Sequence, residues 1–298
     1  MSVLSRPQGS PERVWSLIAG LAALGGRANR ETLEGLFNPG YVKAGVHLRT
    51  KEELAGDSLG AAVSLGLLET DRHDAWLDAA AMASDFDSFA DQVHDRLTEL
   101  ESGHTDAVIL EAYAWIFAES DRQRGLGWIY DWGRDEFADK ANDALLGEDE
   151  EGRPMNTTKI VAWRRWLSFL GLGIPLPLPN VPDYPSPAAR ITRELERGRF
   201  AADGELSADK FLSLISERQP YLDRGRLYLQ ACQRIGHVPK SRMLSPLLSM
   251  ALRDLHDDRT IQLRIRGDAA DAVALSDDPA HPVQSFNLVA FRNSGPQS

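Results

Sequence analysis

The sequence has 298 residues, 43% of them hydrophobic and 26% charged, which is ordinary for a globular protein and long enough for two or three domains. Its formal net charge of −11 argues against binding nucleic acid by bulk electrostatic attraction, although it leaves room for a local basic patch. Cys232 is the only cysteine, which excludes an internal disulfide and a cysteine-based zinc site within one chain.

Signals for a membrane or for secretion are not expected in this sequence. No apolar run approaches the roughly 20 residues that a bilayer-spanning helix needs. The opening residues, MSVLSRPQGSPERVW, lack a basic start followed by an apolar core, so we expect no signal peptide. Together with the single cysteine, these features predict a reducing cytoplasm as the location of the protein.

Residues 1–79 are predicted to form a winged helix-turn-helix. Ser10 is an N-cap before a proline at the first helical position, and Asn29 caps a second short helix. The capping box Thr50-x-x-Glu53 opens a third helix. The segment LLETDRHDAWL then alternates as a short β-hairpin, which would be the wing.

The third helix of such a module enters the major groove when the module binds DNA. Here that helix offers Lys51 but also several carboxylates, which phosphates would repel: Glu52, Glu53 and Asp57. We therefore favour contact with a protein over contact with DNA for this copy.

Residues 80–200 are predicted to form a helical middle domain. One apolar stripe runs from Phe86 to Leu100 and another from Val108 to Phe117, with Trp115 at the margin of the second. The acidic residues 147–151 are most simply a solvated loop, because carboxylates in a flexible loop do not converge on one metal ion.

The loop ESDRQRGLGWIYDWG, residues 119–133, is rich in aromatic residues and arginine, the residue types that dominate binding hot spots. It is a candidate surface for a partner protein. The candidate partner-binding residues are Arg122, Arg124, Trp128 and Trp132. An equally good interpretation is a corner where aromatic side chains close over the core.

The segment NTTKIVAWRRWLSFLGLG predicts a helix that begins at an N-cap, Asn156 or Thr157, and ends at Gly171 and Gly173. Its apolar face consists of Ile160, Trp163, Leu167 and Leu170. Outside that face lie Lys159, Arg164 and Arg165, with Trp166 beside them. The prolines that follow, up to Pro187, predict a stiff extended crossing.

Residues 188–200 predict a polar helix in which arginines are offset by glutamates, a pattern typical of a salt-bridged exposed face. Its arginines are Arg190, Arg193, Arg197 and Arg199. With the cations of the preceding helix they are the best candidate for a basic patch.

Residues 201–298 predict a second winged helix. Ser207 caps one helix, residues 221–235 form another, and Ser245 caps a third that begins with proline. The strand TIQLRIRG alternates apolar and polar residues, which directs Arg264 and Arg266 outward, as a wing on a phosphate backbone requires. The alternative is an ordinary half-exposed strand. Residues 268–284 would be the wing tip and SFNLVAF the returning strand.

These patterns give six candidate contacts to a double-stranded DNA backbone: Lys159, Arg164, Arg165, Arg193, Arg264 and Arg266.

Patterns that carry known chemistry are missing from the sequence. There is no P-loop, no GxGxxG after a strand, no GxSxG and no HExxH, and His237 and Lys240 lack the spacing of a phospholipase-D-type nuclease. The least implausible catalytic cluster is Asp121, Asp131 and Asp135 with a divalent metal. Cys232 lies in an apolar helical stripe and is interpreted as a small buried hydrophobe.

Three segments resemble the DpdG family, a component of bacterial gene clusters that place 7-deazaguanine derivatives in DNA and restrict invading DNA. They are the MSVL opening, AYAWIFAESDRQRGLGW before TTKIVAWRRWLSFLGLG, and LSPLLSMALRDLHDDRTIQLRI. The resemblance implies an antiphage setting with helicase and nuclease partners. It assigns no catalytic residues.

The sequence therefore predicts a mainly α protein with small β wings, in which tandem winged helices flank a helical middle. We expect a non-catalytic adaptor of a DNA-targeting defence complex, with no cofactor and no metal, that contacts a partner protein and DNA backbone. Two alternatives stay open. One is a winged-helix transcription regulator, which needs a symmetric dimer, and the other is a cryptic metal-dependent enzyme.

Overall fold

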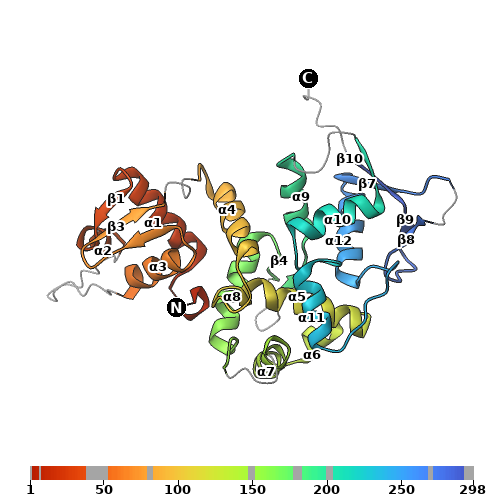
Figure 1. Ribbon diagram of the computed structural model, residues 1–298, viewed down its shortest axis with the longest axis horizontal. Coiled ribbons are helices and arrows are strands. Elements are labelled where there is room, and N and C mark those ends of the chain that lie inside the picture. The colour runs from red at the N-terminus through yellow and green to blue at the C-terminus, as the bar shows by residue number, and fades with distance from the viewer. Residues whose placement is uncertain are drawn as a thin grey trace. The chain divides into compact units, whose positions relative to one another are not determined.

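A computed structural model describes residues 2–6, 8–37, 53–78, 83–146, 152–176, 183–198, 204–267 and 271–291 (Figure 1). The protein is mainly helical with small antiparallel sheets, as predicted. It divides into two compact units, one of Met1–Ala107 with Asn156–Leu170 and one of Val108–Met155 with Gly171–Ser298. The division into parts at 79/80 and 200/201 stays a prediction. Among the described residues, no helix combines the length and apolar character that crossing a bilayer requires.

The first unit begins with a small α/β module. Its elements are η1 (Val3–Ser5), α1 (Pro11–Ala23), β1 (Arg27–Asn29), α2 (Arg30–Phe37), α3 (Glu53–Ser64), β2 (Leu68–Thr70) and β3 (Asp74–Leu77). The strands form an antiparallel sheet in the order β1-β3-β2, in which Ala75 of β3 pairs with Ala28 and Thr70 on its two sides. The hairpin of β2 and β3 confirms the predicted one.

Local signals set the ends of these helices. Asn29 caps α2 by accepting the Thr32 amide at 2.7 Å, as predicted. Helix α1 begins at Pro11 after Ser10, although the Ser10 side chain makes no capping hydrogen bond. The predicted capping box from Thr50 lies outside the described residues, as do Lys51 and Glu52.

The rest of the first unit is built on α4 (Phe86–Glu99) and α8 (Thr157–Leu170). Asn156 caps α8 by accepting the Lys159 amide at 2.8 Å, and Gly171 ends the helix with a φ of +77°. The predicted apolar face is buried. Trp166 was expected beside the charged residues, but it is only 1% exposed. The expectation was wrong because α8 packs against α4, α1 and η1, which cover more than one of its faces.

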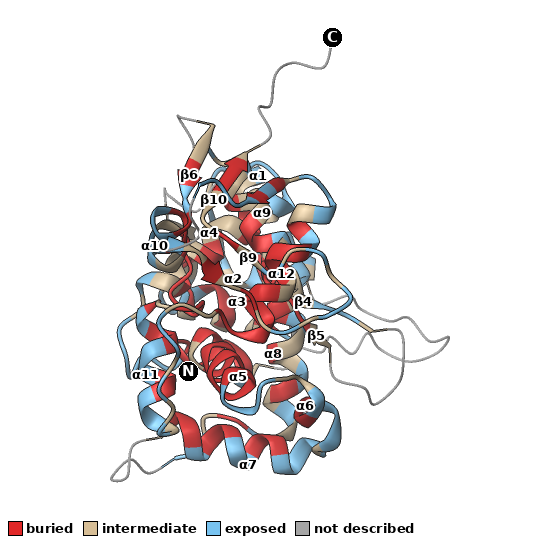
Figure 2. Cartoon of the chain, turned by 90° about the vertical axis from the view of Figure 1, so that its right-hand side faces the viewer, coloured by how far each residue is buried: buried red, intermediate tan, exposed pale blue. Residues whose placement is uncertain are grey.

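The second unit is organised around α5 (Val108–Gln123). Figure 2 shows this helix buried along nearly its whole length, whereas α7 (Arg134–Leu145) keeps an exposed side. Trp115, predicted at the margin of a stripe, is 2% exposed. That prediction was wrong because α7, α11 (Arg226–Arg234) and α12 (Pro246–Asp257) all pack on α5, so the helix has no solvent face. A short helix, α6 (Gly127–Asp131), links α5 to α7.

Two strand pairs and a helix follow in the second unit. Strands β4 (Gly173–Ile174) and β5 (Tyr184–Pro185) pair on either side of the predicted proline crossing, of which residues 177–182 lie outside the described residues. Helix α9 (Ala188–Glu196) was predicted as an exposed salt-bridged helix. Its Arg190 and Glu194 are instead 0% and 1% exposed, because α9 packs against α12.

The C-terminal part repeats the order of the N-terminal module. After α9 come β6 (Glu205–Ser207), α10 (Ala208–Arg218), α11, α12, β7 (Ile261–Arg264), the paired strands β8 (Val273–Ala274) and β9 (Ser285–Phe286), and β10 (Leu288–Phe291). The sheet order β6-β10-β7 matches β1-β3-β2, since the first strand pairs with the third and the third with the second. Compared with the N-terminal module, α11 and the β8–β9 pair are additions.

The predicted caps of this part are confirmed. Ser207 accepts the Lys210 amide at 3.3 Å, and Ser245 accepts the Leu248 amide at 3.3 Å before Pro246. Strand β7 alternates as expected through Arg264, but it ends there, and Ile265 is 51% exposed. Part of the predicted wing tip, 268–270, lies outside the described residues.

Candidate functional site

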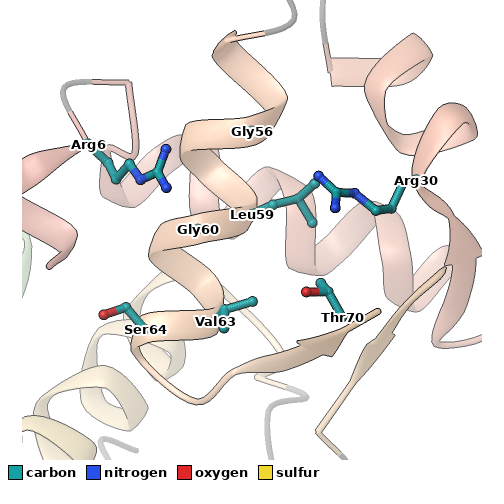
Figure 3. A pocket seen from close by; sticks show the side chains of 8 residues that line it. All are labelled: Arg6, Arg30, Gly56, Leu59, Gly60, Val63, Ser64 and Thr70. Carbon is teal, nitrogen blue, oxygen red and sulfur yellow. The ribbon is translucent and has the colours of Figure 1, made fainter. Parts of the chain in front are cut away.

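A groove lies along α3 in the N-terminal module (Figure 3). It has a volume of about 290 Å³, and two glycines one turn apart, Gly56 and Gly60, leave its floor without side chains. Arg6 and Arg30 reach toward α3 from opposite sides, and the 41%-exposed Val63 points toward Thr70. The groove is therefore apolar along its floor and cationic at both edges.

One of the carboxylates expected on α3 is paired within the module. Asp57 accepts a hydrogen bond from Arg6 at 3.2 Å, with the Asp57 side chain 16% exposed. Arg30 lies 3.8 Å from Glu34, one turn along α2. Both groove arginines thus have acidic neighbours in the same module, and the groove is not a strong anion site by itself.

The six cations predicted to touch DNA are divided between the two units. Lys159, Arg164 and Arg165 lie on α8 of the first unit. Arg165 is exposed and pairs with Glu12 of α1 at 3.0 Å. Burial lowers the pKa of the Lys159 ammonium, which is only partly exposed. Arg193, on α9 of the second unit, is also partly exposed.

Arg264 and Arg266 are exposed and close together on β7 and the residues after it. Both pair with Glu205 of β6, at 3.0 Å and 3.3 Å. No pattern in the sequence points to this carboxylate, because it is 59 residues from Arg264 and meets it only through the sheet. The two arginines share one glutamate, whose single charge does not neutralise both guanidinium groups.

The loop predicted to bind a partner divides into exposed arginines and buried tryptophans. Trp128 is 5% exposed and packs on Trp115, Trp132 and Phe137 with ring centroids 5.5, 4.7 and 6.5 Å away. Arg122 is about half exposed and pairs with the buried Glu119 at 2.6 Å, a hydrogen bond that raises the pKa of its guanidinium. Trp128 thus contributes to the core, whereas the arginines and Tyr130 are exposed and Trp132 is partly exposed.

Asp121 is the centre of a buried hydrogen-bond network. Its side chain is 2% exposed and accepts from Arg124 Nη1 at 2.9 Å and from Tyr228 Oη at 3.0 Å, and it contacts His237 Nε2 at 2.6 Å. Asp131 and Asp135 are exposed. Within the described ranges these three carboxylates do not gather closely enough to share an ion. The metal cluster suggested by their spacing is therefore not assembled.

Asp223 ties the turn before α11 to the start of α12. It is 5% exposed and accepts from both the amide and the hydroxyl of Ser245, each at 2.6 Å. Burial, together with the nearby charge of Asp121, raises the pKa of the Asp223 carboxyl to about 6 against the opposing hydrogen bonds from Ser245. A carboxyl with a raised pKa makes stability depend on pH.

We expect Asp223→Asn to remove a pH dependence of stability. As pH rises from about 4 to about 6, the unfolded chain releases the Asp223 proton while the folded chain keeps it, so the wild type loses up to about 3 kcal/mol. The side-chain amide introduced by the substitution would not titrate. The measurement is urea unfolding of both proteins through this pH range, with Asp135→Asn on the surface of α7 as a control. A constant difference in unfolding free energy between wild type and Asp223→Asn would contradict the prediction.

A family model described as DpdG-like matches residues 1–269. No curated protein and no solved structure matches the chain.

Proposed function

The chain belongs to the DpdG-like family, and from this premise we propose that it is a non-catalytic adaptor in a bacterial DNA modification and restriction system. Its partners would be the helicase and nuclease components of that system, in the cytoplasm. The observation that carries the proposal is the repeated module, because both ends of the chain have a helix, a strand, helices and two strands with the same sheet order.

We infer that both modules are winged helices. In this fold a three-stranded sheet pairs its first strand with the third, and the hairpin of the last two strands is the wing. The arrangement β1-β3-β2 beside α1, α2 and α3 supports the inference for the N-terminus. The arrangement β6-β10-β7 beside α9, α10 and α12 supports it for the C-terminus.

The N-terminal module is proposed to hold the partner protein. Its α3 presents glycines and Val63 where a DNA-reading helix would present hydrogen-bonding side chains. A small apolar groove edged by arginines fits a protein segment better than a base edge. Arg122, Arg124, Trp128 and Trp132 are proposed as a second partner surface, with Trp128 supporting it from the core.

The C-terminal module is proposed to touch the DNA backbone through its wing. Arg264 and Arg266 are exposed and share Glu205. Surface ion pairs contribute little, so a phosphate could replace Glu205 as their partner at small cost. Lys159, Arg164, Arg165 and Arg193 are proposed as further backbone contacts.

Two variants should separate the two proposed contacts. We expect Val63→Glu, in the α3 groove, to abolish co-purification with the co-expressed helicase or nuclease and to leave DNA affinity unchanged. We expect Arg264→Glu with Arg266→Glu to lower affinity for duplex DNA about tenfold and to reduce the slope of log K against log salt by about 2, with the partner retained. Co-purification and fluorescence anisotropy with a labelled duplex measure these effects.

Helix α7, which lies in the second unit like the wing arginines, offers a charge-matched control. Arg134→Glu with Lys140→Glu makes the same change in net charge on an exposed helix and should leave the salt slope as in wild type. If the control and the wing variant weakened DNA binding equally, the wing contact would be refuted. If Val63→Glu still retained the partner, the groove contact would be refuted.

A further inference from the structure

Two cations, Arg124 and Lys240, contact the sulfur of Met243 in the second unit. Arg124 Nη1 lies 3.7 Å from Met243 Sδ, and Lys240 Nζ lies 3.9 Å from the same sulfur. The two nitrogens are therefore no further apart than the sum of these distances. Their residues are separated by more than 100 positions in the sequence, and the fold alone brings them together.

Arg124 is held in place by buried groups. Its Nη1 donates to Asp121 at 2.9 Å, while 39% of its side chain stays exposed. Its backbone has a φ of +58°, a left-handed conformation that costs a non-glycine residue about 1 kcal/mol or more. The position after α5 thus keeps an arginine where glycine would be easier. A guanidinium has five N–H groups, so the bond to Asp121 leaves others for a ligand.

Lys240 is positioned by the same carboxylate through His237. The His237 ring contacts Asp121 at 2.6 Å, and its backbone amide donates to the Cys232 carbonyl at 2.8 Å. This anchors the segment that carries Lys240 to the end of α11. Lys240 is exposed, and within the described parts of the chain no carboxylate lies at ion-pairing distance from it.

Arg124 and Lys240 differ in their acidic partners from the cations predicted to touch DNA. Arg165, Arg264 and Arg266 each meet an accessible glutamate. Arg124 instead donates to Asp121, a buried aspartate that also contacts Tyr228 and His237. Lys240 has no acidic partner among the described residues. Two like charges this close repel each other unless an anion lies between them. An anionic ligand bound between the two side chains would explain why a chain of net charge −11 keeps two cations so close together at its surface.

The spacing fits a phosphate group. Two phosphate oxygens that each accept a hydrogen bond can link nitrogens up to roughly 8 Å apart. We propose that Arg124 and Lys240 form a clamp for a phosphodiester group of a nucleic-acid backbone, with Asp121 and His237 as positioning residues. The clamp does not use the wing arginines. It assigns Arg124, which is also part of the proposed partner surface, to a nucleic-acid ligand, and in this it goes beyond the proposed function.

The backbone of a nucleic acid fits the surroundings better than a small phosphate compound does. Small ligands are taken up in concave sites that bury most of their surface. Here both cations are accessible, and the neighbouring Val238 is 85% exposed. An open pair of cations beside a protruding apolar side chain suits a long polyanion that passes over the surface.

The test is fluorescence anisotropy with a labelled duplex at several salt concentrations. Lys240→Glu is expected to lower affinity five- to tenfold and to reduce the salt slope by about 1. Arg124→Asn is expected to do the same, because asparagine tolerates a left-handed backbone and removes the guanidinium. A thermal unfolding midpoint near the wild-type value shows that each variant is folded.

Lys140→Glu, an exposed lysine on α7 of the same unit, is the matched control and should keep the wild-type slope. If Lys240→Glu matched this control, the clamp would be overturned even where the wing variant weakened binding. If Lys240→Glu alone weakened binding, the clamp would stand and the wing contact would fail. A second measurement is the rise in the thermal unfolding midpoint that pyrophosphate causes. If Lys240→Glu reduced this rise but left duplex binding unchanged, the assignment to a nucleic-acid backbone would be overturned.

Discussion

Replacing Trp166 with alanine is expected to lower the free energy of unfolding of the first unit by about 3–5 kcal/mol. The indole is 1% exposed, so its removal leaves a cavity among side chains that cannot all move in to fill it. Trp166 meets Phe169 edge to face at 5.6 Å, and Phe169 in turn packs on Phe86 and Phe89 at 4.9 and 5.4 Å. Loss of Trp166 would therefore loosen the contact between α8 and α4.

Val161 gives the control on the same helix. Its side chain is 54% exposed, so Val161→Ala keeps the helix and creates no cavity. We expect it to change stability by less than about 1 kcal/mol. Urea unfolding followed by circular dichroism measures both variants against wild type. Equal, small effects of the two substitutions would show that α8 is not the core helix of this unit.

Features of the chain that depend on a few neighbouring residues could be predicted from the sequence. The caps at Asn29, Asn156, Ser207 and Ser245 each need only a side-chain oxygen and an amide three residues later. The hairpin of β2 and β3 also follows from alternation and a polar turn. Such signals set where elements begin and end, and the structure bears them out.

Features that depend on which elements meet could not be predicted in the same way. Helix α5 has an apolar stripe, but the sequence does not say that three further helices cover its other faces. Leu36 is apolar but 59% exposed, since the short α2 buries little beyond Leu33. The period of a helix identifies one apolar face, and the burial of the remaining faces is decided by tertiary packing.

The candidate sites likewise have some features that depend on neighbouring residues and others that depend on tertiary packing. Alternation along β7 placed Arg264 outward, because strand direction is local. Partners that lie far away in the sequence could not be predicted: Glu205 meets Arg264, and Met243 meets Arg124, across long stretches of chain. The pairing of Arg124 with Lys240 therefore has no sequence signal, and only the folded chain shows it.

Replacing Arg190 with methionine is expected to destabilise the second unit by about 3–5 kcal/mol. The side chains of Arg190 and Glu194 are 0% and 1% exposed and lie 2.8 Å apart, one turn apart on α9. Methionine fills much of the space of arginine but leaves a buried carboxylate without this partner. Arg197, 24% exposed and 3.1 Å from Glu194, can compensate only in part because it approaches from the surface.

A double variant separates the loss of the ion pair from the loss of packing. Arg190→Met with Glu194→Leu replaces both charges with apolar groups, so we expect it to lie within about 1 kcal/mol of wild type, since a well-packed apolar pair often matches a buried ion pair. Arg218→Met, at the exposed end of α10, controls for the loss of one arginine. Urea unfolding at neutral pH gives the free energies of wild type, of Arg190→Met and Glu194→Leu alone, of the double variant and of Arg218→Met. A double variant as unstable as the sum of its singles would mean that the arginine acts through packing, and that its charge contributes nothing to α9.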